Sequence, residues 1–298
     1  MLSSRIAILS CTLLATAALA GCAPTDNKST DNKSAGSSGS GSAGSSAATN
    51  CDKANLAVRT PGVFTVATDN PAYEPWFSDN KPSNGKGYES AVAYAVAKQL
   101  GFAPSEVKWV TASFNSVVTP GRKSFDVDIN QVSISEERKK AVDFSSGYYD
   151  VAQAVVSYQG SKIASAASLA QLKDAKLGAQ VGTTSYLTIV NTIKPTSKPA
   201  VYDTNDLAVQ ALKNKQIDGI VVDLPTGFYM SAAQLDHGVI VGQLPPGNSP
   251  EQFGMVLAKG SPLTACVSKA VDALRQDGTL SALQQQWLTT AGGAPVLK

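Results

Sequence analysis

The sequence predicts an α/β fold with two lobes, and three features of residues 51–298 indicate it. Short apolar runs alternate with helical segments, which is typical of mostly parallel sheets covered by helices. The alternation forms two successive series, and the segment is long enough for two hydrophobic cores. Polar clusters follow apolar runs in both series, and such folds bind ligands at the carboxyl ends of strands. We therefore expect a small-ligand site in a cleft between the lobes.

The first series opens with a strand that runs into two prolines. Pro71 and Pro75 force a loop after this strand. An Ala/Val-rich helix follows and stops at Gly101, a common C-terminal cap. The predicted strands are Val63–Thr68, Val107–Val110, Phe125–Ile129 and Val151–Tyr158, and the predicted helices are Tyr88–Leu100 and Phe114–Val118. We assign residues 51–155 to the first part of lobe 1.

The second series repeats the alternation after the turn-like Gln159-Gly160-Ser161. The predicted strands are Lys176–Val181, Ala200–Tyr202, Ile217–Val222, Val239–Val241 and Phe253–Ala258. The predicted helices are Ser185–Thr192, Asn205–Lys213, Thr226–Gln234, Leu263–Gln276 and Thr279–Leu288. We assign residues 156–245 to lobe 2 and residues 246–298 to the second part of lobe 1.

The N-terminus has the pattern of a targeting signal. Met1–Arg5 carries one positive charge, and the apolar run Ile6–Ala20 is short for a membrane span. Leu19-Ala20-Gly21-Cys22 resembles the bacterial lipobox, in which the cysteine becomes the lipidated first residue. We expect residues 1–22 to be a lipoprotein signal peptide with lipidation at Cys22. The alternative is an ordinary secretory signal with an incidental cysteine.

Residues 23–50 are rich in Ser, Gly, Ala and Thr and contain no large apolar side chain. A segment of this composition cannot form a core. It is expected to be a flexible tether between a membrane anchor and the folded head.

The cysteines agree with an exported protein. Of the four, Cys11 would leave with the signal and Cys22 would carry lipid. Cys51 and Cys266 remain, and an even remainder in an exported protein indicates one disulfide. The alternative is two unpaired thiols.

Composition and motifs argue against several classes of function. Without Arg5 the chain carries 24 basic and 23 acidic residues, so nothing indicates a nucleic-acid face. No spacing of Cys, His and Asp suggests a metal site, and no Gly-rich phosphate loop is present. His237 is the sole histidine and lies in a turn-like segment, where a surface role is expected. We expect no metal, no cofactor and no catalytic residue.

The segment Asp126–Tyr149 contains the first candidate site. A strand-like run gives way to the polar residues Asn130–Ser135 and then to a helix start. Ser135 is a good N-cap type, and Arg138 stands where a capping box has Glu or Gln. A hydroxyl, free backbone N–H groups and a guanidinium suit a small carboxylate, which Arg can hold with two parallel bonds. The alternative is a surface turn with a solvated arginine.

Four polar clusters at predicted strand ends give the chain a family resemblance. They are Thr68-Asp69…Tyr73…Trp76, Asn130–Arg138, Gly182–Ser185 and Val222-Asp223. The motifs VATDNPAYEPWF, GYESAVAYAVAKQLGF, DVDINQVSISEERKKAVDFSSGYY, LGAQVGTTSY, IDGIVVDLP and FGMVLAKGSPL follow in order over Pro61–Leu288. Together they resemble the family 3 extracellular solute-binding proteins of ABC transporters. The resemblance implies the two-lobed periplasmic-binding-protein type II fold, with a hinge and an interlobe cleft.

The resemblance also implies ten ligand-binding residues. They are Asp69, Tyr73, Phe114, Asn130, Gln131, Ser133, Arg138, Thr184, Ser185 and Asp223. Arg138 would clamp the α-carboxylate with the backbone N–H groups of Ser133 and Thr184, since helix N-termini favour anions. Asp223 would accept from the α-ammonium, aided by Asn130 or Gln131.

Tyr73 and Phe114 would enclose the ligand side chain, and Asp69 would touch the ammonium or that side chain. Several of these residues have a structural alternative. Tyr73 and Phe114 would then be core aromatics, Asp69 would satisfy donors of its own turn, and Asp223 would pair with a lysine. Thr183 and Ser185 would only cap a helix, and Trp76 is expected to pack.

Two departures from the family pattern bear on the choice of ligand. One extra residue separates Asp69 from Tyr73, and Gln131 is bulkier than the residue often found there. The ligand therefore stays open among polar amino acids, including glutamate, glutamine, asparagine and basic ones.

The function implied by the resemblance is capture of an amino acid by hinge closure and delivery to an ABC importer permease. The hinges would lie near Val155–Gln159 and Gln243–Gln252. The protein would be a monomer on the extracytoplasmic face of the cell membrane, held there by its lipid alone. Two alternatives remain: a same-fold enzyme, such as a cleft lyase or dehydratase, and a receptor subunit that senses the ligand.

Overall fold

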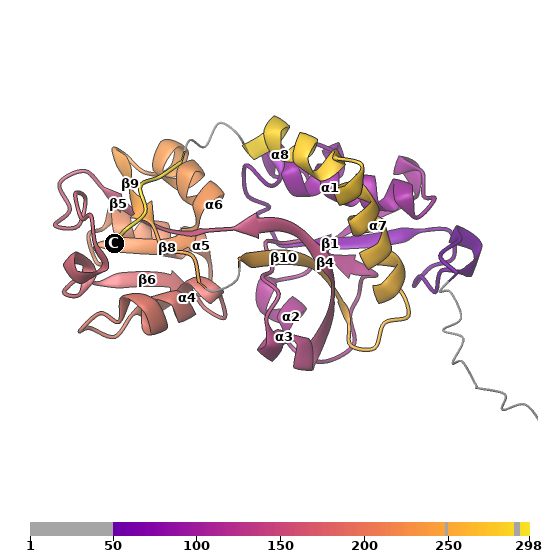
Figure 1. The fold of residues 1–298 in the computed structure, drawn as a ribbon, viewed down its shortest axis with the longest axis horizontal. Helices are drawn as coiled ribbons and strands as arrows, with labels where there is room; N and C mark the ends of the chain where they lie inside the picture. Colours follow the sequence, from indigo (N-terminus) through magenta and orange to yellow (C-terminus); the bar gives the residue numbers. More distant parts are fainter. Residues whose placement is uncertain (1–49, 248–249, 289–292) are drawn as a thin grey trace, which may run out of the picture. The chain divides into compact units, whose positions relative to one another are not determined.

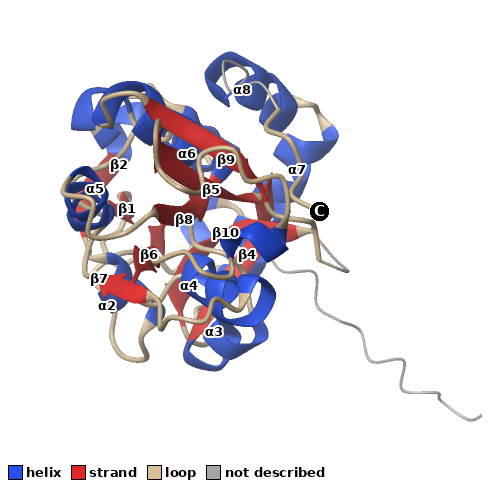
Figure 2. Cartoon of the chain, turned by 90° about the vertical axis from the view of Figure 1, so that its left-hand side faces the viewer, coloured by secondary structure: helices blue, strands red, loops and turns tan. Residues whose placement is uncertain are grey.

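A computed structural model of the chain describes residues 50–247, 250–288 and 293–298. The predicted signal peptide, the predicted lipidation at Cys22 and the predicted tether up to residue 49 lie outside the described residues. The described part contains two five-stranded sheets with helices packed against them, which confirms the α/β class (Figures 1 and 2).

The first sheet has the strand order β2-β1-β3-β10-β4. Its strands are β1 Phe64–Thr68, β2 Val107–Thr111, β3 Val127–Asp128, β4 Val142–Val151 and β10 Glu251–Ala258. Its helices are α1 Tyr88–Gln99, α2 Phe114–Val118, α3 Glu136–Ala141, α7 Thr264–Gln276 and α8 Thr279–Leu288. Short 3₁₀ turns lie at Lys53–Asn55, Ser78–Asn80, Pro82–Asn84 and Pro104–Glu106. We call this sheet with its helices lobe 1.

The second sheet has the strand order β7-β6-β8-β5-β9. Its strands are β5 Gln153–Tyr158, β6 Leu177–Gln180, β7 Ala200–Tyr202, β8 Gly219–Asp223 and β9 Gly238–Gln243. Its helices are α4 Thr184–Thr188, α5 Asn205–Lys213 and α6 Leu224–Tyr229; a 3₁₀ turn lies at Leu169–Leu172, and π-helical turns continue α4 over Ile189–Ile193 and α6 over Met230–Gln234. We call this sheet with its helices lobe 2.

Both sheets contain parallel and antiparallel strand pairs. β1 is parallel to β2 and β3, and β6 is parallel to β7 and β8, as expected for strands joined through helices. β10 runs antiparallel to β3 and β4, and β5 runs antiparallel to β8 and β9. The antiparallel members β4, β5, β9 and β10 are the strands that carry the chain between the sheets.

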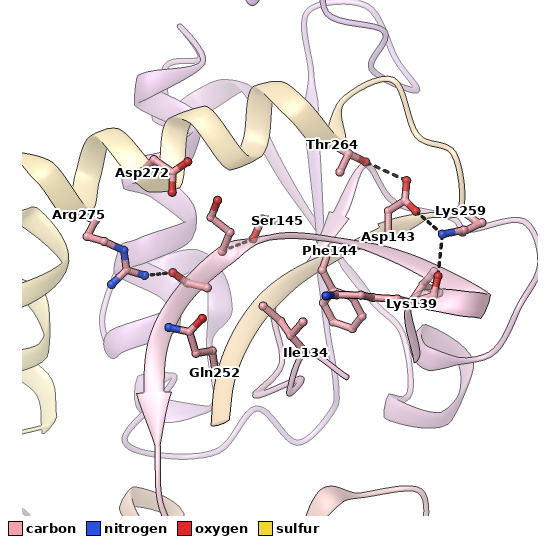
Figure 3. A pocket seen from close by; sticks show the side chains of 13 residues that line it. Ile134, Lys139, Asp143, Phe144, Ser145, Gln252, Lys259, Thr264, Asp272 and Arg275 are labelled. Carbon is pink, nitrogen blue, oxygen red and sulfur yellow. Dashed lines mark hydrogen bonds and ion pairs between the residues drawn. The ribbon is translucent and has the colours of Figure 1, made fainter. Parts of the chain in front are cut away.

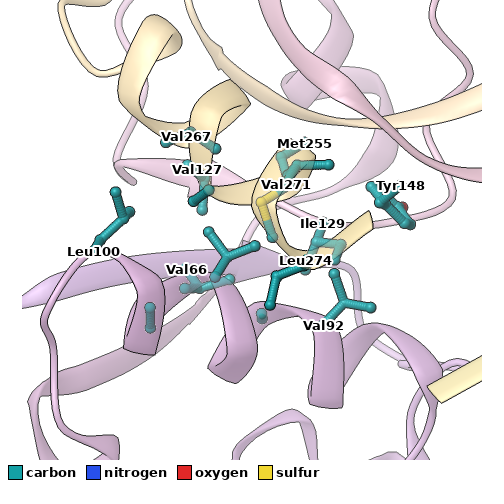
Figure 4. Packing of buried hydrophobic residues seen from close by; sticks show 14 of the residues in the cluster. Val66, Val92, Leu100, Val127, Ile129, Tyr148, Met255, Val267, Val271 and Leu274 are labelled. Atoms are coloured by element: carbon teal, nitrogen blue, oxygen red, sulfur yellow. The ribbon is translucent and has the colours of Figure 1, made fainter. Parts of the chain in front are cut away.

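The main core of lobe 1 lies between the first sheet and the helices α1 and α7 (Figure 4). Val66 and Val127 of neighbouring strands are fully buried there, as is Val92 of α1. Val271 of α7 closes the cluster. Burying an aliphatic side chain of this size contributes about 1.5–3 kcal/mol, so the cluster fixes the strand ends that carry the polar residues.

The first crossing between sheets lies earlier than the sequence indicated. β4 ends at Val151 and β5 begins at Gln153, so the chain changes sheet at Ala152 rather than at residue 155 or 156. The strand β4 was not predicted, because its small and polar residues (VDFSSGYYDV) hide the alternation. Its pairing with β10 shows that tertiary contacts, not local propensity, decide the conformation there.

The C-terminal residues also lie in a different lobe from the one predicted. Residues 294–298 pack on the second sheet, although residues 246–298 were assigned to lobe 1. Val296 forms a parallel bridge with Gln243 at the end of β9, and Leu297 is 1% exposed within a lobe 2 core. This yellow segment runs beside β9 in Figure 1. It covers an edge strand and buries an apolar side chain, which explains its position.

The predicted disulfide is present. Cys51 and Cys266 are bonded, with their Cα atoms 5.4 Å apart. The bond ties the residue that starts the described head to helix α7. No helix within the described ranges combines the length and hydrophobicity that crossing a bilayer requires.

Candidate ligand-binding site

The ten residues predicted to bind a ligand all line one cavity of about 40 Å³. The cavity lies between the two sheets, because its walls come from both lobes. Gln180, Thr183, Asn205, Val221 and Val222 complete its lining.

A larger cavity of about 880 Å³ lies elsewhere, against β4 and α7 (Figure 3). Its charged groups are mostly occupied with protein partners. Asp143 accepts from Thr264 Oγ1 and pairs with Lys259 at 3.0 Å. Arg275 donates to the carbonyl of Gly147. We therefore look for the functional site in the smaller cavity, where charges still lack partners.

Arg138 reaches the cavity from the first turn of α3. Ser135 caps this helix as predicted, because its hydroxyl accepts from the Arg138 backbone N–H at 3.2 Å. The guanidinium donates to the carbonyl oxygens of Ser133, at 2.7 Å, and Gly182, at 2.9 Å. Its carbon lies 5.3 Å from the centre of the Phe114 ring. A guanidinium has five N–H donors, so these bonds leave donors for an anion.

The wall opposite Arg138 is the turn between β6 and α4. Thr183 is the N-cap of α4 and accepts from the Tyr186 N–H at 3.2 Å. Thr184 begins the helix, where backbone N–H groups have no intrahelical acceptor. The hydroxyls of Thr184 and Ser133 lie 3.2 Å apart and so join the lobes. Gly182 has φ +72°, and a Cβ there would lie 3.1 Å from Asn115 Oδ1.

Asp223 ends β8 and lines the cavity without an ion-pair partner among the described residues. Its Oδ1 accepts from Gln153 Nε2 at 2.6 Å. Burial, reinforced by the nearby Glu251 carboxylate, raises the pKa of Asp223 well above its ordinary value. None of the ion pairs found along residues 50–247, 250–288 and 293–298 includes Asp223. The site therefore has a position where a cation would be favourable.

Gln153 holds the side chain of Asp223 in place and was not predicted as a site residue. Besides Asp223, it contacts Ser185, whose hydroxyl donates to Gln153 Oε1 at 2.7 Å, and Glu251 Oε2 at 3.4 Å. It is the first residue of β5, immediately after the crossing between sheets. A polar residue inside the apolar run VAQAVV was the sequence signal that could have identified it.

Asp69, Tyr73 and Phe114 also line the cavity. Asp69 accepts from the N–H groups of Asn70, at 2.7 Å, and Phe114, at 3.2 Å, so the structural role considered for it is real. Each carboxylate oxygen has a further lone pair. The buried Tyr73 hydroxyl lies near Asp206 without closing a hydrogen bond, and Asn130 Nδ2 is also unpartnered among the described residues. Burial raises the pKa of the Tyr73 phenol.

Gln131 is fixed by a buried acid that the sequence reading also missed. Glu89 of α1 is fully buried and accepts from the Gln131 backbone N–H at 2.7 Å, from Gln131 Nε2 and from the Tyr148 hydroxyl. Burial raises the pKa of Glu89 to about 7, and these hydrogen bonds oppose the rise. An acid in the apolar helix segment GYESAVAYAV was the available signal.

Two further residues lie outside the cavity. Trp76 is fully buried in the lobe 1 core, as expected for packing, and its Nε1 donates to Thr226 Oγ1 of lobe 2 at 2.8 Å. His237 lies in the turn before β9. In the described part of the chain, His, Cys, Asp and Glu side chains form no group of three suited to a metal ion.

Comparison with known proteins gives a consistent family. Residues 64–290 match the bacterial extracellular solute-binding proteins, family 3. The L-cystine-binding protein TcyJ of Escherichia coli K12 is 30% identical over 247 residues, which cover 81% of this chain and 86% of the relative.

Solved structures agree. An ancestral arginine-binding protein bound to glutamine has a TM-score of 0.64 and 30% identity, covering 76% of this chain and 98% of its own. The ancestral amino acid-binding protein AncCDT-1, described as a precursor of cyclohexadienyl dehydratase, has a TM-score of 0.61 and 29% identity, covering 76% and 95%.

Proposed function

Since the chain belongs to family 3 of the bacterial extracellular solute-binding proteins, we propose that it binds a free amino acid in the cavity between its lobes. One observation carries the proposal. Arg138 and Asp223, of opposite charge, line the same small cavity, and each can still take a charged partner. Every free α-amino acid supplies both a carboxylate and an ammonium.

The shared part of the ligand would be held at three points. Arg138 would bind the α-carboxylate with its remaining N–H donors, helped by the backbone N–H groups of Ser133 and Thr184. Asp223 would accept from the α-ammonium. Ser185 would act through Gln153, because its hydroxyl already donates to that side chain, which in turn holds Asp223.

The ligand side chain would lie toward Asp69, Tyr73, Phe114, Asn130 and Gln131. This end combines two aromatic rings with polar atoms that still have bonding capacity. Such a surface suits a polar side chain, since apolar ring faces and a few fixed polar groups together give orientation and specificity.

Binding would require the lobes to separate and close again. Ligand pockets usually measure about 300–1,000 Å³. This cavity measures about 40 Å³, so the lobes would have to move apart to admit an amino acid. The bonds of Arg138 to Gly182 and of Ser133 to Thr184 would break on opening. The bending positions would be Ala152 and the chain just after Gln243, where β4 and β9 end before the chain passes to the other sheet. A ligand that touches both lobes favours closure through its differential contacts.

The closed protein would then deliver its ligand to the permease of an ABC importer. It would do so as a monomer on the extracytoplasmic side of the membrane, after removal of the signal peptide and lipidation at Cys22. This part of the proposal rests on the family and on the N-terminal sequence.

A second candidate, a cleft lyase or dehydratase, is favoured by the raised pKa of Asp223, which would suit a general acid. The two functions differ in what happens to the ligand. A binding protein returns the amino acid unchanged after release from saturated protein, whereas an enzyme converts it.

Thermal unfolding with each of the twenty amino acids tests the proposal. A ligand at 100 times its dissociation constant stabilises the protein by about 2.7 kcal/mol, which gives a clear rise in Tm. Mass spectrometry of the released ligand then separates binding from turnover. If no amino acid raises the Tm, the proposed function is wrong.

A further inference from the structure

Glu89 connects the helix α1 to the lining of the cavity. It stands in the first turn of α1 and is fully buried. Two of its three hydrogen bonds go to a single residue, Gln131, through the backbone N–H and the side-chain Nε2. The third comes from Tyr148 of β4. Among the described residues, no other acidic side chain is found to accept hydrogen bonds from both the backbone and the side chain of one cavity-lining residue.

Gln131 needs this support because of its backbone conformation. Its φ is +49°, in the left-handed region that non-glycine residues rarely adopt. Such residues persist where the surroundings determine them. The two bonds to Glu89 hold both the backbone and the side chain of Gln131, so they set how it meets the cavity.

The chemistry of Glu89 decides which end of the Gln131 amide is held. An ionised carboxylate can only accept hydrogen bonds. Gln131 Nε2 donates to Glu89, so the amide oxygen has no bond to Glu89 and is the end left for a ligand. In this orientation the amide oxygen can accept a hydrogen bond from a ligand.

The surroundings of Gln131 are also acidic. Asp69 also lines the cavity, and the fully buried Asp128 of β3 has no hydrogen bond to either carboxyl oxygen among the described residues. The nearby Lys123 is held by the carbonyls of Ser116, at 2.8 Å, and Thr119, at 2.5 Å. Gln131 thus lies in a part of the protein that is rich in carboxyl groups.

We propose that Glu89 is a positioning residue that turns the Gln131 amide oxygen toward the ligand, so that the cavity selects amino acids whose side chain donates hydrogen bonds. The inference rests on the proposed function and narrows its ligand. Arginine, lysine, histidine and glutamine have side chains that donate hydrogen bonds. The carboxylates of glutamate and aspartate only accept them, as the Gln131 amide oxygen does, so they would not pair with it.

A cationic ligand bound next to Gln131 would also cause nearby carboxyl groups to release protons. The titratable groups that face Glu89 are Tyr88 on its own helix, Asp128 of β3, Tyr148 of β4 and Asp223 of β8. Burial raises the pKa of each of these carboxyls, and that of Glu89 lies near neutrality. A positive charge nearby favours the ionised form and lowers these pKa values, so binding releases protons and tightens as pH rises through 7.

The first test is competition calorimetry with the wild-type chain. Arginine, lysine, histidine, glutamine, glutamate, aspartate and leucine serve as ligands. We expect at least one donor-bearing amino acid to bind at least about tenfold more tightly than glutamate, since unpaired buried acceptors are penalised. Tightest binding of glutamate or leucine would overturn the inference and leave amino-acid binding intact. Binding of none would instead reject the proposed function.

The second test uses variants on both sides of the contact. Gln131→Met keeps the side-chain length and removes the acceptor, so affinity for the donor-bearing ligand should fall at least about tenfold. Affinity for leucine, whose side chain donates no hydrogen bond, should fall by a smaller factor. Glu89→Gln frees the Gln131 amide to turn, so the preference over glutamate should shrink and the pH dependence should flatten.

Asp126→Asn is the matched control. Like Glu89, Asp126 is buried and has a raised pKa. It accepts from the backbone N–H groups of Arg59 and Thr65, and it does not line the cavity. The control should lose stability without a change in ligand preference. Glu89→Gln with the same preference and pH profile as Asp126→Asn would show that Glu89 is only structural.

Proton release provides a readout that needs no variant to fold. Calorimetry at about pH 7 in phosphate and in Tris, which differ in ionisation enthalpy, counts the protons released on binding. We expect release with arginine, less release in Glu89→Gln, and release equal to wild type in Asp126→Asn. Equal enthalpies in both buffers for the wild-type chain would contradict the proposed placement of the cation.

Discussion

Arg138 shows how one residue can serve both the protein and a ligand. Its guanidinium already bonds to carbonyls of both lobes, at Ser133 and Gly182. These acceptors are neutral, so they orient the group without neutralising its charge. The bond to Ser133 lies within lobe 1, so it can orient the guanidinium even when the lobes separate, which reduces the entropy lost on binding.

Replacing Arg138 by alanine should weaken amino-acid binding by about 2–5 kcal/mol, because the ligand carboxylate would be buried without its partner. Isothermal titration measures the effect. Arg59→Ala is the matched control, since Arg59 also donates to a carbonyl, that of Lys123, but lies outside the cavity. An unchanged affinity in Arg138→Ala would exclude Arg138 as the carboxylate clamp.

Gln153 is expected to matter through Asp223. Gln153→Met removes the only hydrogen bond found to the Asp223 carboxylate among the described residues, and also the acceptor of Ser185. Affinity should fall about tenfold, because the ammonium partner loses its fixed orientation. Gln159→Met, in the turn directly after β5 and outside the cavity lining, should bind as the wild type does. Equal titration curves for the two variants would assign Gln153 a packing role only.

Among the elements, those with strong local signals were predictable. Helix α1 begins and ends within one residue of its predicted span, because its apolar face and Gly101 mark it clearly. Strand β4 and the pairing of Val296 with Gln243 were missed, since their sequences carry no alternation and depend on partners far along the chain. The same dependence on distant partners explains why the sequence analysis placed the crossing between the sheets at residue 155 or 156 instead of at Ala152.

The disulfide links two elements that are 215 residues apart in sequence. A cross-link over a long loop restricts the unfolded chain, and losing a native disulfide usually costs about 2–5 kcal/mol. We expect the Cys51→Ser, Cys266→Ser double variant to lose stability in this range in urea denaturation. Its ligand affinity should not change, because neither cysteine lines the cavity. A wild-type midpoint in the double variant would contradict this.

For the molecule as a whole, the residues that line the candidate site were easier to predict than the residues that hold them in place. All ten proposed residues meet in one cavity, because each follows a strand or begins a helix at the edge where the sheets face each other. Glu89 and Gln153 were not found, since their roles consist of contacts with residues far away in sequence. The role of a buried polar side chain depends on its hydrogen-bond partner, and a single sequence does not show which residue that partner is.

The buried acids should give the protein an unusual dependence of stability on pH. Glu89, Asp126, Asp128 and Asp223 all have raised pKa values in the folded state, chiefly because of burial. Above the ordinary pKa of a carboxyl, the folded state then binds more protons than the unfolded state. Stability therefore falls as pH rises through the folded pKa values.

We expect the free energy of unfolding, without added amino acid, to decrease from about pH 5 to about pH 8, with up to about 1.4 kcal/mol per pH unit for each proton retained. Urea denaturation at several pH values measures it. Glu89→Gln should reduce the slope, while Glu106→Gln, whose carboxylate pairs with Lys53 at the surface and has a lowered pKa, should not. A flat or rising curve in the wild type would contradict the prediction.

The two ends of the described chain are held by different lobes. Asp52 adjoins the cysteine bonded to α7, whereas Lys298 follows the buried Leu297 beside β9. A donor dye near Asp52 and an acceptor dye at Lys298 would thus form a spectroscopic ruler across the cavity without touching its wall. Energy transfer between them would report each opening and closing in single molecules, and the dwell times would show whether a ligand slows opening or speeds closure.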